Sequence, residues 1–137
     1  SDNFGDGVSI DGDTIVVTAP SDDITANTDQ GSAYVFLRTG AAWAQQQKLT
    51  ASNGAASDLL GRGGAVSISG DTIAIGSRNK ASNAGRVYLY NRIITTWTES
   101  TILTSPDVGT DATARFGSAV SLSGDTLAVG ALTSSIG

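Results

Sequence analysis

Val120–Ala131, with the sequence VSLSGDTLAVGA, is the last of three near-identical copies of one stretch. The earlier copies are VSIDGDTIVVTA, from Val8 to Ala19, and VSISGDTIAIGS, from Val66 to Ser77. Each copy contains a short apolar strand, a Gly-Asp pair and a longer strand rich in β-branched residues. Because glycine adopts a positive φ at little cost, a two-residue hairpin turn can form at that pair. The sequence therefore predicts three β-hairpins, with turns centred on Gly12, Gly70 and Gly124.

The repeat extends beyond the hairpin on both sides. Upstream, a Phe-Gly or Leu-Gly pair recurs at intervals of 56 residues, at Phe4, Leu60 and Phe116. Downstream, Gly31–Phe36 matches Gly85–Tyr90, and Trp43 matches Trp97, both with an offset of 54 residues. One repeat therefore holds four antiparallel strands in about 55 residues, which is typical of a β-propeller blade.

We predict an all-β fold of about two and a half propeller blades, with ten strands and no helix longer than one turn. A single repeat domain covers residues 1–137, with blade one at 4–52, blade two at 60–104 and a half blade at 116–131. The second strand of a repeat is apolar on both faces, as expected of a blade covered by two neighbours. The fourth strand is the most polar and is predicted to form the outer edge. We expect the recurring aromatic residues to pack between blades: Tyr34, Phe36, Trp43, Tyr88, Tyr90 and Trp97.

The composition argues against several classes of function. A net charge of −5 and a pI of about 4.3 do not suit a nucleic-acid partner. No apolar run approaches the roughly 20 residues that are needed to span a bilayer. The chain has no histidine and no cysteine, so it lacks the ordinary general base near neutral pH and a thiol nucleophile. A propeller-type glycoside hydrolase or lyase with paired carboxylates stays as an alternative, because aspartate is plentiful.

With these features the chain resembles the FG-GAP repeats of integrin α-subunit-like β-propellers, over essentially its whole length. The first signature is kept at Phe4-Gly5 and Phe116-Gly117 and altered at Leu60-Gly61. The second is degenerate: Thr18-Ala19-Pro20, Gly76-Ser77-Arg78 and Gly130-Ala131-Leu132. The resemblance implies a non-enzymatic module that is secreted or at the cell surface. Complete members usually have seven blades, so we expect this chain to be a piece of a longer parent.

Many members of that family hold calcium in the hairpin between the first two strands of a blade. Calcium takes six to eight oxygen ligands, and the Gly-Asp turns here supply one or two carboxylates each. We therefore expect no calcium there and no other cofactor, and we expect Asp13, Asp71 and Asp125 to bond the turn backbone. The remaining metal candidates are Asp22, Asp23 and Asp29, in one loop of blade one. Either this is a solvated loop, or it is a weak metal or ligand site.

The long and variable loops all fall on the face of the blades opposite the Gly-Asp turns. They comprise residues 20–31, 52–60, 78–84 and 105–115. Such loops on a rigid scaffold are where binding residues usually lie, and in the resembling family this face receives protein ligands. The leading hypothesis is a recognition or adhesion module that binds a protein or glycan ligand, with no catalytic residue assigned. The structural alternative is a repeat that self-assembles, because its bare blade faces predict association with copies of itself or with the rest of the parent propeller.

Overall fold

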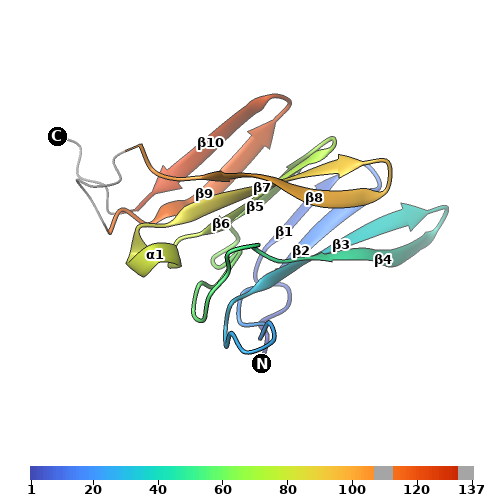
Figure 1. Cartoon of the computed structure of the whole chain (residues 1–137). Coiled ribbons are helices and arrows are strands. Elements are labelled where there is room, and N and C mark those ends of the chain that lie inside the picture. The colour runs from blue at the N-terminus through green and yellow to red at the C-terminus, as the bar shows by residue number, and fades with distance from the viewer. Residues whose placement is uncertain (107–112, 133–137) are drawn as a thin grey trace.

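The computed structural model describes residues 1–106 and 113–132, which form three antiparallel sheets lying side by side (Figure 1). Blade one has the strand order β1-β2-β3-β4, blade two has β5-β6-β7-β8, and blade three contains β9 and β10. The strands of blade one are β1 (Val8–Asp11), β2 (Thr14–Ala19), β3 (Ser32–Thr39) and β4 (Ala42–Leu49). Those of blade two are β5 (Val66–Ser69), β6 (Thr72–Ser77), β7 (Arg86–Ile93) and β8 (Thr96–Leu103). Blade three has β9 (Phe116–Ser123) and β10 (Thr126–Ala131).

The described residues thus contain the ten predicted strands, and the prediction of an all-β fold made of partial propeller blades is confirmed. Among the described residues the single helical element is α1 (Lys80–Asn83), and three of its four residues, Ala81, Ser82 and Asn83, have positive φ angles of 54°, 57° and 76°. It is therefore a coiled turn in a loop rather than a regular α-helix. The predicted limit of one helical turn is confirmed for the described part of the chain.

The three Gly-Asp turns have the predicted two-residue geometry. Gly12, Gly70 and Gly124 adopt φ angles of 55°, 55° and 53°, which a residue with a Cβ reaches only at a cost. In each hairpin the residue before glycine pairs with the threonine after aspartate, as in Asp11 with Thr14. Because the same turn fixes the same register three times, equivalent residues point to equivalent faces of all three sheets.

The main core lies between blade one and blade two. From blade one, Val16 and Val35 contribute to it, and from blade two it includes Ile73, Ile75 and Tyr88, all of which are fully buried. The outer strands β4 and β8 are also joined by side-chain hydrogen bonds, in addition to the apolar packing of Leu49 and Trp97. Gln47 on β4 donates from Nε2 to the Trp97 carbonyl at 2.7 Å and accepts from the Trp97 N–H at 2.8 Å. The predicted position of the polar fourth strand at the outer edge is confirmed by the strand order.

The Phe-Gly pair of the repeat, which is Leu60-Gly61 in the second copy, contacts the preceding blade just before that blade's third strand. We call this contact the Phe-Gly step. The Phe116 N–H donates to the Ala84 carbonyl at 3.0 Å, and the equivalent Leu60 N–H donates to the Gln30 carbonyl at 3.0 Å. The backbones meet so closely that a Cβ on Gly85 would lie 2.0 Å from the Phe116 carbonyl oxygen. Only glycine fits at such an approach. The sequence motif is therefore a device that holds consecutive blades together.

The aromatic prediction is right for blade two and wrong for blade one. Tyr88, Tyr90 and Trp97 of blade two pack between blades as expected, with Trp97 only 2% exposed. The equivalent residues of blade one do not: Trp43 is 41% exposed, and Tyr34 and Phe36 are half-buried and contact Phe4 of their own blade. The reason lies in the direction these residues face. Trp97 faces blade one and donates from Nε1 to Gln46, whereas no described blade covers the corresponding face of blade one.

Candidate functional site

Three of the four long loops pack together at the end of the sheets opposite the Gly-Asp turns. We call residues 20–31, 52–60 and 78–84 the loop surface; the fourth loop, 105–115, lies largely outside the described residues. In Figure 1 these loops lie around the N-terminus and α1, and the hairpin turns lie at the far ends of the strands. The loop surface combines segments of two blades and the connection between them.

The first two loops are joined by their backbones. The Ser57 N–H donates to the Thr28 carbonyl at 2.8 Å, and the Leu59 N–H donates to the Asp29 carbonyl at 3.1 Å. Asn27 adds a side-chain bond from Nδ2 to the Gly54 carbonyl at 3.3 Å. Since these bonds run along several residues of both loops, residues 27–30 and 54–60 are held as one layer.

A buried ion pair joins the second loop to the third. Lys80 Nζ lies 2.7 Å from Asp58 Oδ2, and their side chains are only 13% and 9% exposed. The same Asp58 oxygen accepts the Ala55 N–H at 2.6 Å. The buried carboxylate is therefore neutralised by Lys80 and also hydrogen-bonded by the backbone. Nearby, the Tyr88 hydroxyl donates to Asn53 Oδ1 at 2.7 Å. Burial, together with the negative charge of Asp58, raises the pKa of Tyr88, so the hydroxyl stays a donor at neutral pH.

A cavity of about 520 Å³ opens between these two loops. Its walls are short polar and apolar side chains together with the buried ion pair: Ala55, Ala56, Ser57, Asp58, Asn79, Lys80, Ala81, Ser82 and Asn83. The left-handed residues of α1 form one wall. Its size falls within the range of pockets that take a small molecule or the side chains of a partner.

Asp22, one of the predicted metal candidates, is buried in a cluster of side chains from blade one. Its Oδ2 lies 2.7 Å from Lys48 Nζ and accepts hydrogen bonds from the Tyr34 hydroxyl at 2.9 Å and from the Ser32 hydroxyl. Burial acts to raise the pKa of Asp22, but the bonds from Lys48, Ser32 and Tyr34 outweigh it, and the pKa lies below its usual value. For Lys48, burial acts to lower the pKa, and the bond to Asp22 raises it overall. Asp22 therefore acts as an anchor for this loop.

The other two candidates serve the local loop structure. Asp23 Oδ1 accepts the backbone N–H of Asp29 at 2.8 Å, which closes residues 23–29 into a compact loop. Asp29 itself has a φ of 54° and lines a second cavity of about 330 Å³ with Asp6, Arg62 and others. Within residues 1–106 and 113–132, no three acidic side chains converge as a metal site would require.

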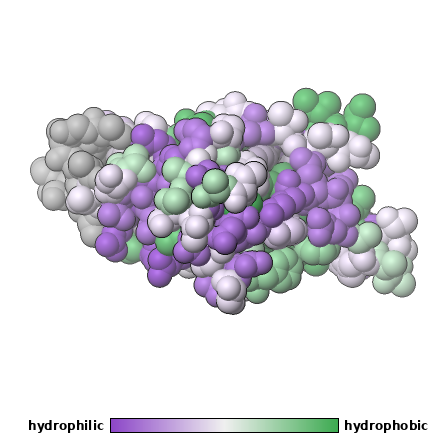
Figure 2. Space-filling model, turned by 60° about the horizontal axis from the view of Figure 1, so that its bottom comes forward, coloured by the Kyte–Doolittle hydropathy of each residue, from purple (hydrophilic) through white to green (hydrophobic). Residues whose placement is uncertain are grey.

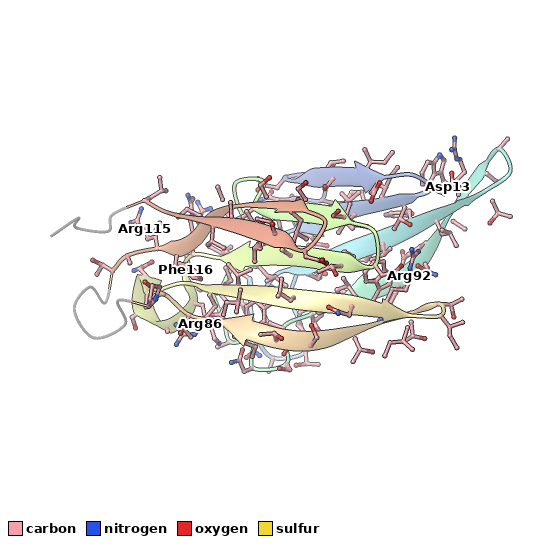
Figure 3. The ribbon with its side chains drawn as sticks, turned by 90° about the horizontal axis from the view of Figure 1, so that it is seen from above. Asp13, Arg86, Arg92, Arg115 and Phe116 are labelled. Carbon is pink, nitrogen blue, oxygen red and sulfur yellow. The ribbon has the colours of Figure 1, made fainter. Side chains whose placement is uncertain are left out.

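Two of the three aspartates of the Gly-Asp turns, Asp13 and Asp71, each form an ion pair with an arginine on the third strand of their blade. Asp13 Oδ1 lies 2.6 Å from Arg38 on β3, and Asp71 Oδ1 lies 2.6 Å from Arg92 on β7. The guanidinium groups of Arg38 and Arg92 in turn lie over the rings of Trp43 and Trp97, at 5.6 and 5.1 Å from the ring centroids. The predicted bonds from these carboxylates to the turn backbone are thus replaced by an Asp-Arg-Trp stack. Figure 3 places Asp13 and Arg92 at the turn end of the sheets, and Arg86, Arg115 and Phe116 at the opposite end.

A family model described as FG-GAP repeat matches residues 1–36, 43–90 and 97–137. The chain belongs to the FG-GAP repeat family. Its second matched segment begins on the outer strand of one sheet and ends on the third strand of the next, so a repeat of this family bridges two blades. This agrees with the Phe-Gly step, which joins one blade to the next. A search of curated proteins found no match.

Figure 2 shows the molecule from below the view of Figure 1, where the N-terminus and the blade-one loops project; the surface is mostly hydrophilic, with the larger apolar patches near its edges. The described part of the chain holds no helix with the length and apolar character that crossing a membrane demands. The three loops of the loop surface are rich in polar residues, and the buried ion pair and the backbone hydrogen bonds hold them together.

Proposed function

We propose that this FG-GAP module is a non-enzymatic recognition or adhesion unit of a secreted or cell-surface protein, and that the loop surface binds a protein ligand. The observation that carries the proposal is the joining of three loops from two blades into one layer, with a cavity of about 520 Å³ between two of them. A preformed surface binds with a smaller loss of conformational entropy than separate mobile loops do.

The chemistry of the loop surface supports binding rather than catalysis. Its two buried carboxylates, Asp22 and Asp58, are each compensated by a lysine within 2.7 Å. A general acid in a glycoside hydrolase needs a raised pKa, whereas the pKa of Asp22 is lowered. A glycan is the second ligand class, because hydroxyl and amide groups such as those of Ser57, Asn79 and Asn83 line the cavity.

The test is a binding screen of the purified chain against a panel of extracellular proteins and a glycan array, followed by affinity measurement with variants. Thr28 is exposed on the loop surface, and Thr95 is exposed on the β7–β8 turn at the other end of blade two. We expect Thr28→Arg to weaken binding by about tenfold or more, because the new side chain blocks the surface, and Thr95→Arg to leave it unchanged.

A ligand that binds equally well to both variants would contradict the assignment of the loop surface. Binding to glycans alone would favour the second ligand class. If neither panel contains a ligand for the wild-type chain, while its circular dichroism shows the folded state, the proposed function is not supported.

A further inference from the structure

The innermost strands of the three blades are linked by a ladder of side-chain to backbone hydrogen bonds. Ser9 Oγ on β1 accepts the Ile68 N–H of β5 at 3.1 Å, and Ser67 Oγ on β5 accepts the Leu122 N–H of β9 at 2.9 Å. One step further along the strands, Asp11 Oδ2 accepts the Gly70 N–H at 2.6 Å, and Ser69 Oγ accepts the Gly124 N–H at 3.1 Å. Each inner strand therefore offers acceptors to the next blade and donors to the previous one.

At blade one the ladder ends in donors. β1 pairs with β2 in the same register as β5 pairs with β6, with Ile10 opposite Ile15 and Ile68 opposite Ile73. The N–H groups of Ile10 and Gly12 therefore occupy the positions from which the Ile68 and Gly70 N–H groups donate across the blade junction. At blade three the ladder ends in acceptors, because Ser121 and Ser123 are the repeat equivalents of Ser67 and Ser69. Both serines are exposed to solvent, whereas Ser67 and Ser69 accept the Leu122 and Gly124 N–H groups of the next blade.

The apolar side chains show the same asymmetry. Val8 and Ile10 on blade one are 61% and 59% exposed, whereas their equivalents Val66 and Ile68 are each 6% exposed because they pack against blade one. On the far side of blade three, a shallow groove of about 340 Å³ is lined by Ala119, Ser121, Ala128 and neighbouring residues. In blade two the equivalent small residues, Ala65 and Ala74, are buried under β9.

From this we infer that the chain associates head to tail, with blade one of a second copy seated on the outer face of blade three. In this contact the Ile10 and Gly12 N–H groups of one copy donate to the Ser121 and Ser123 hydroxyls of the other. The side chains of Val8 and Ile10 fill the groove beside Ala119 and Ala128. The two faces are matched because each is the repeat copy of a face that already packs against its counterpart inside the chain.

The contact joins two different surfaces, so it is heterologous, and it produces a ring or a filament according to whether the rotation between copies closes. It does not involve the loop surface and is independent of the proposed ligand. A further blade of the same repeat on a longer polypeptide would use the same donors and acceptors, but the test below concerns the 137-residue chain itself.

The experiment measures the mass of the chain in solution by sedimentation over a concentration series. Ile10→Arg blocks the donor face, and Ala128→Arg blocks the acceptor face; both residues are exposed, so both variants should fold. The matched control is Ile94→Arg, which makes the same change at an isoleucine on the β7–β8 turn that is even more exposed than Ile10, at 92% against 59%. We expect the wild type and the control to associate with similar dissociation constants. In each blocked variant the dissociation constant should rise by about tenfold or more.

Mixing the two blocked variants gives the sharper result. Each retains the face that the other lacks, so an equimolar mixture should form a heterodimer and no larger species. In hydrogen exchange, the amides of Ile10 and Gly12 should be slowed when the chain associates. A wild-type chain that stays monomeric, blocked variants that associate like the wild type, or a mixture that does not pair would each overturn the inference.

Discussion

Blade one and blade two have nearly the same sequence pattern but very different environments. Val8, Ile10 and Trp43 are exposed to solvent, and their equivalents Val66, Ile68 and Trp97 are buried against blade one. The strands, turns and registers of the two blades are the same. In this fold the repeat therefore determines the local structure, and the presence of a neighbouring blade determines what each residue contributes to stability.

The largest effect is expected at the tryptophan pair. Trp97→Ala should lower the free energy of unfolding by about 3–5 kcal/mol, because it removes a buried side chain and leaves a cavity between the blades. Trp43→Ala should cost about 1 kcal/mol or less, since this ring is partly exposed and contacts mainly Arg38. Urea denaturation followed by circular dichroism measures both. Equal losses would mean that the face of blade one is covered in solution.

The isoleucine pair tests the same difference without an aromatic ring. Ile68→Ala is expected to lower the free energy of unfolding by about 2–5 kcal/mol, as for other buried aliphatic residues. Ile10→Ala should lower it by about 0.5 kcal/mol or less in dilute protein, where the chain is monomeric. Thermal denaturation at low protein concentration is the measurement. A loss at Ile10 that matches the loss at Ile68 would contradict the comparison.

The ion pair of Asp22 with Lys48 has no equivalent in blade two, and its contribution to the free energy of unfolding depends on pH. The pKa of Asp22 is lowered in the folded protein, so its stabilisation is present above about pH 4, the range of an unfolded aspartate, and is lost as the pH falls through the lower folded pKa. Asp22→Asn should therefore lower the free energy of unfolding by about 1–2 kcal/mol at neutral pH. Denaturation curves at a series of acidic pH values should show the two proteins converging. A constant difference down to the lowest pH would contradict the ion pair.

The smallest effect is expected at the turn aspartates. Asp71→Asn keeps a good turn residue but removes the ion pair with Arg92, and because Asp71 is exposed we expect a loss of about 0.2–1 kcal/mol. Asp125 is the matched control, because the described part of blade three contains no third strand to supply an arginine. Asp125→Asn should leave the denaturation midpoint unchanged. An equal shift in both variants would show that the carboxylates act on the turn itself.

The sequence predicted the hairpins, the strand order and the polar outer edge, because alternating patterns and Gly-Asp turns act over a few residues. It did not predict the exposure of Trp43, since that depends on a neighbouring blade rather than on the repeat. The pairs Asp13–Arg38 and Asp71–Arg92 did have a signal: both arginines recur at the same offset as the tryptophans. The ion pairs Asp22–Lys48 and Asp58–Lys80 could not be predicted in this way, because their residues are not repeated at the equivalent positions of the other blade.

The Phe-Gly step, which crosses from each blade to the one before it, also bears on how the protein unfolds. Its backbone bonds connect only consecutive blades, so the cooperativity of folding is that of a linear array with nearest-neighbour coupling. Blade two is coupled on both sides and should open last, whereas blade one can fray from its uncovered face while the rest stays folded. The slowest amide exchange should therefore lie in the middle of the chain, in β6 and β7, where a local opening must break both junctions at once.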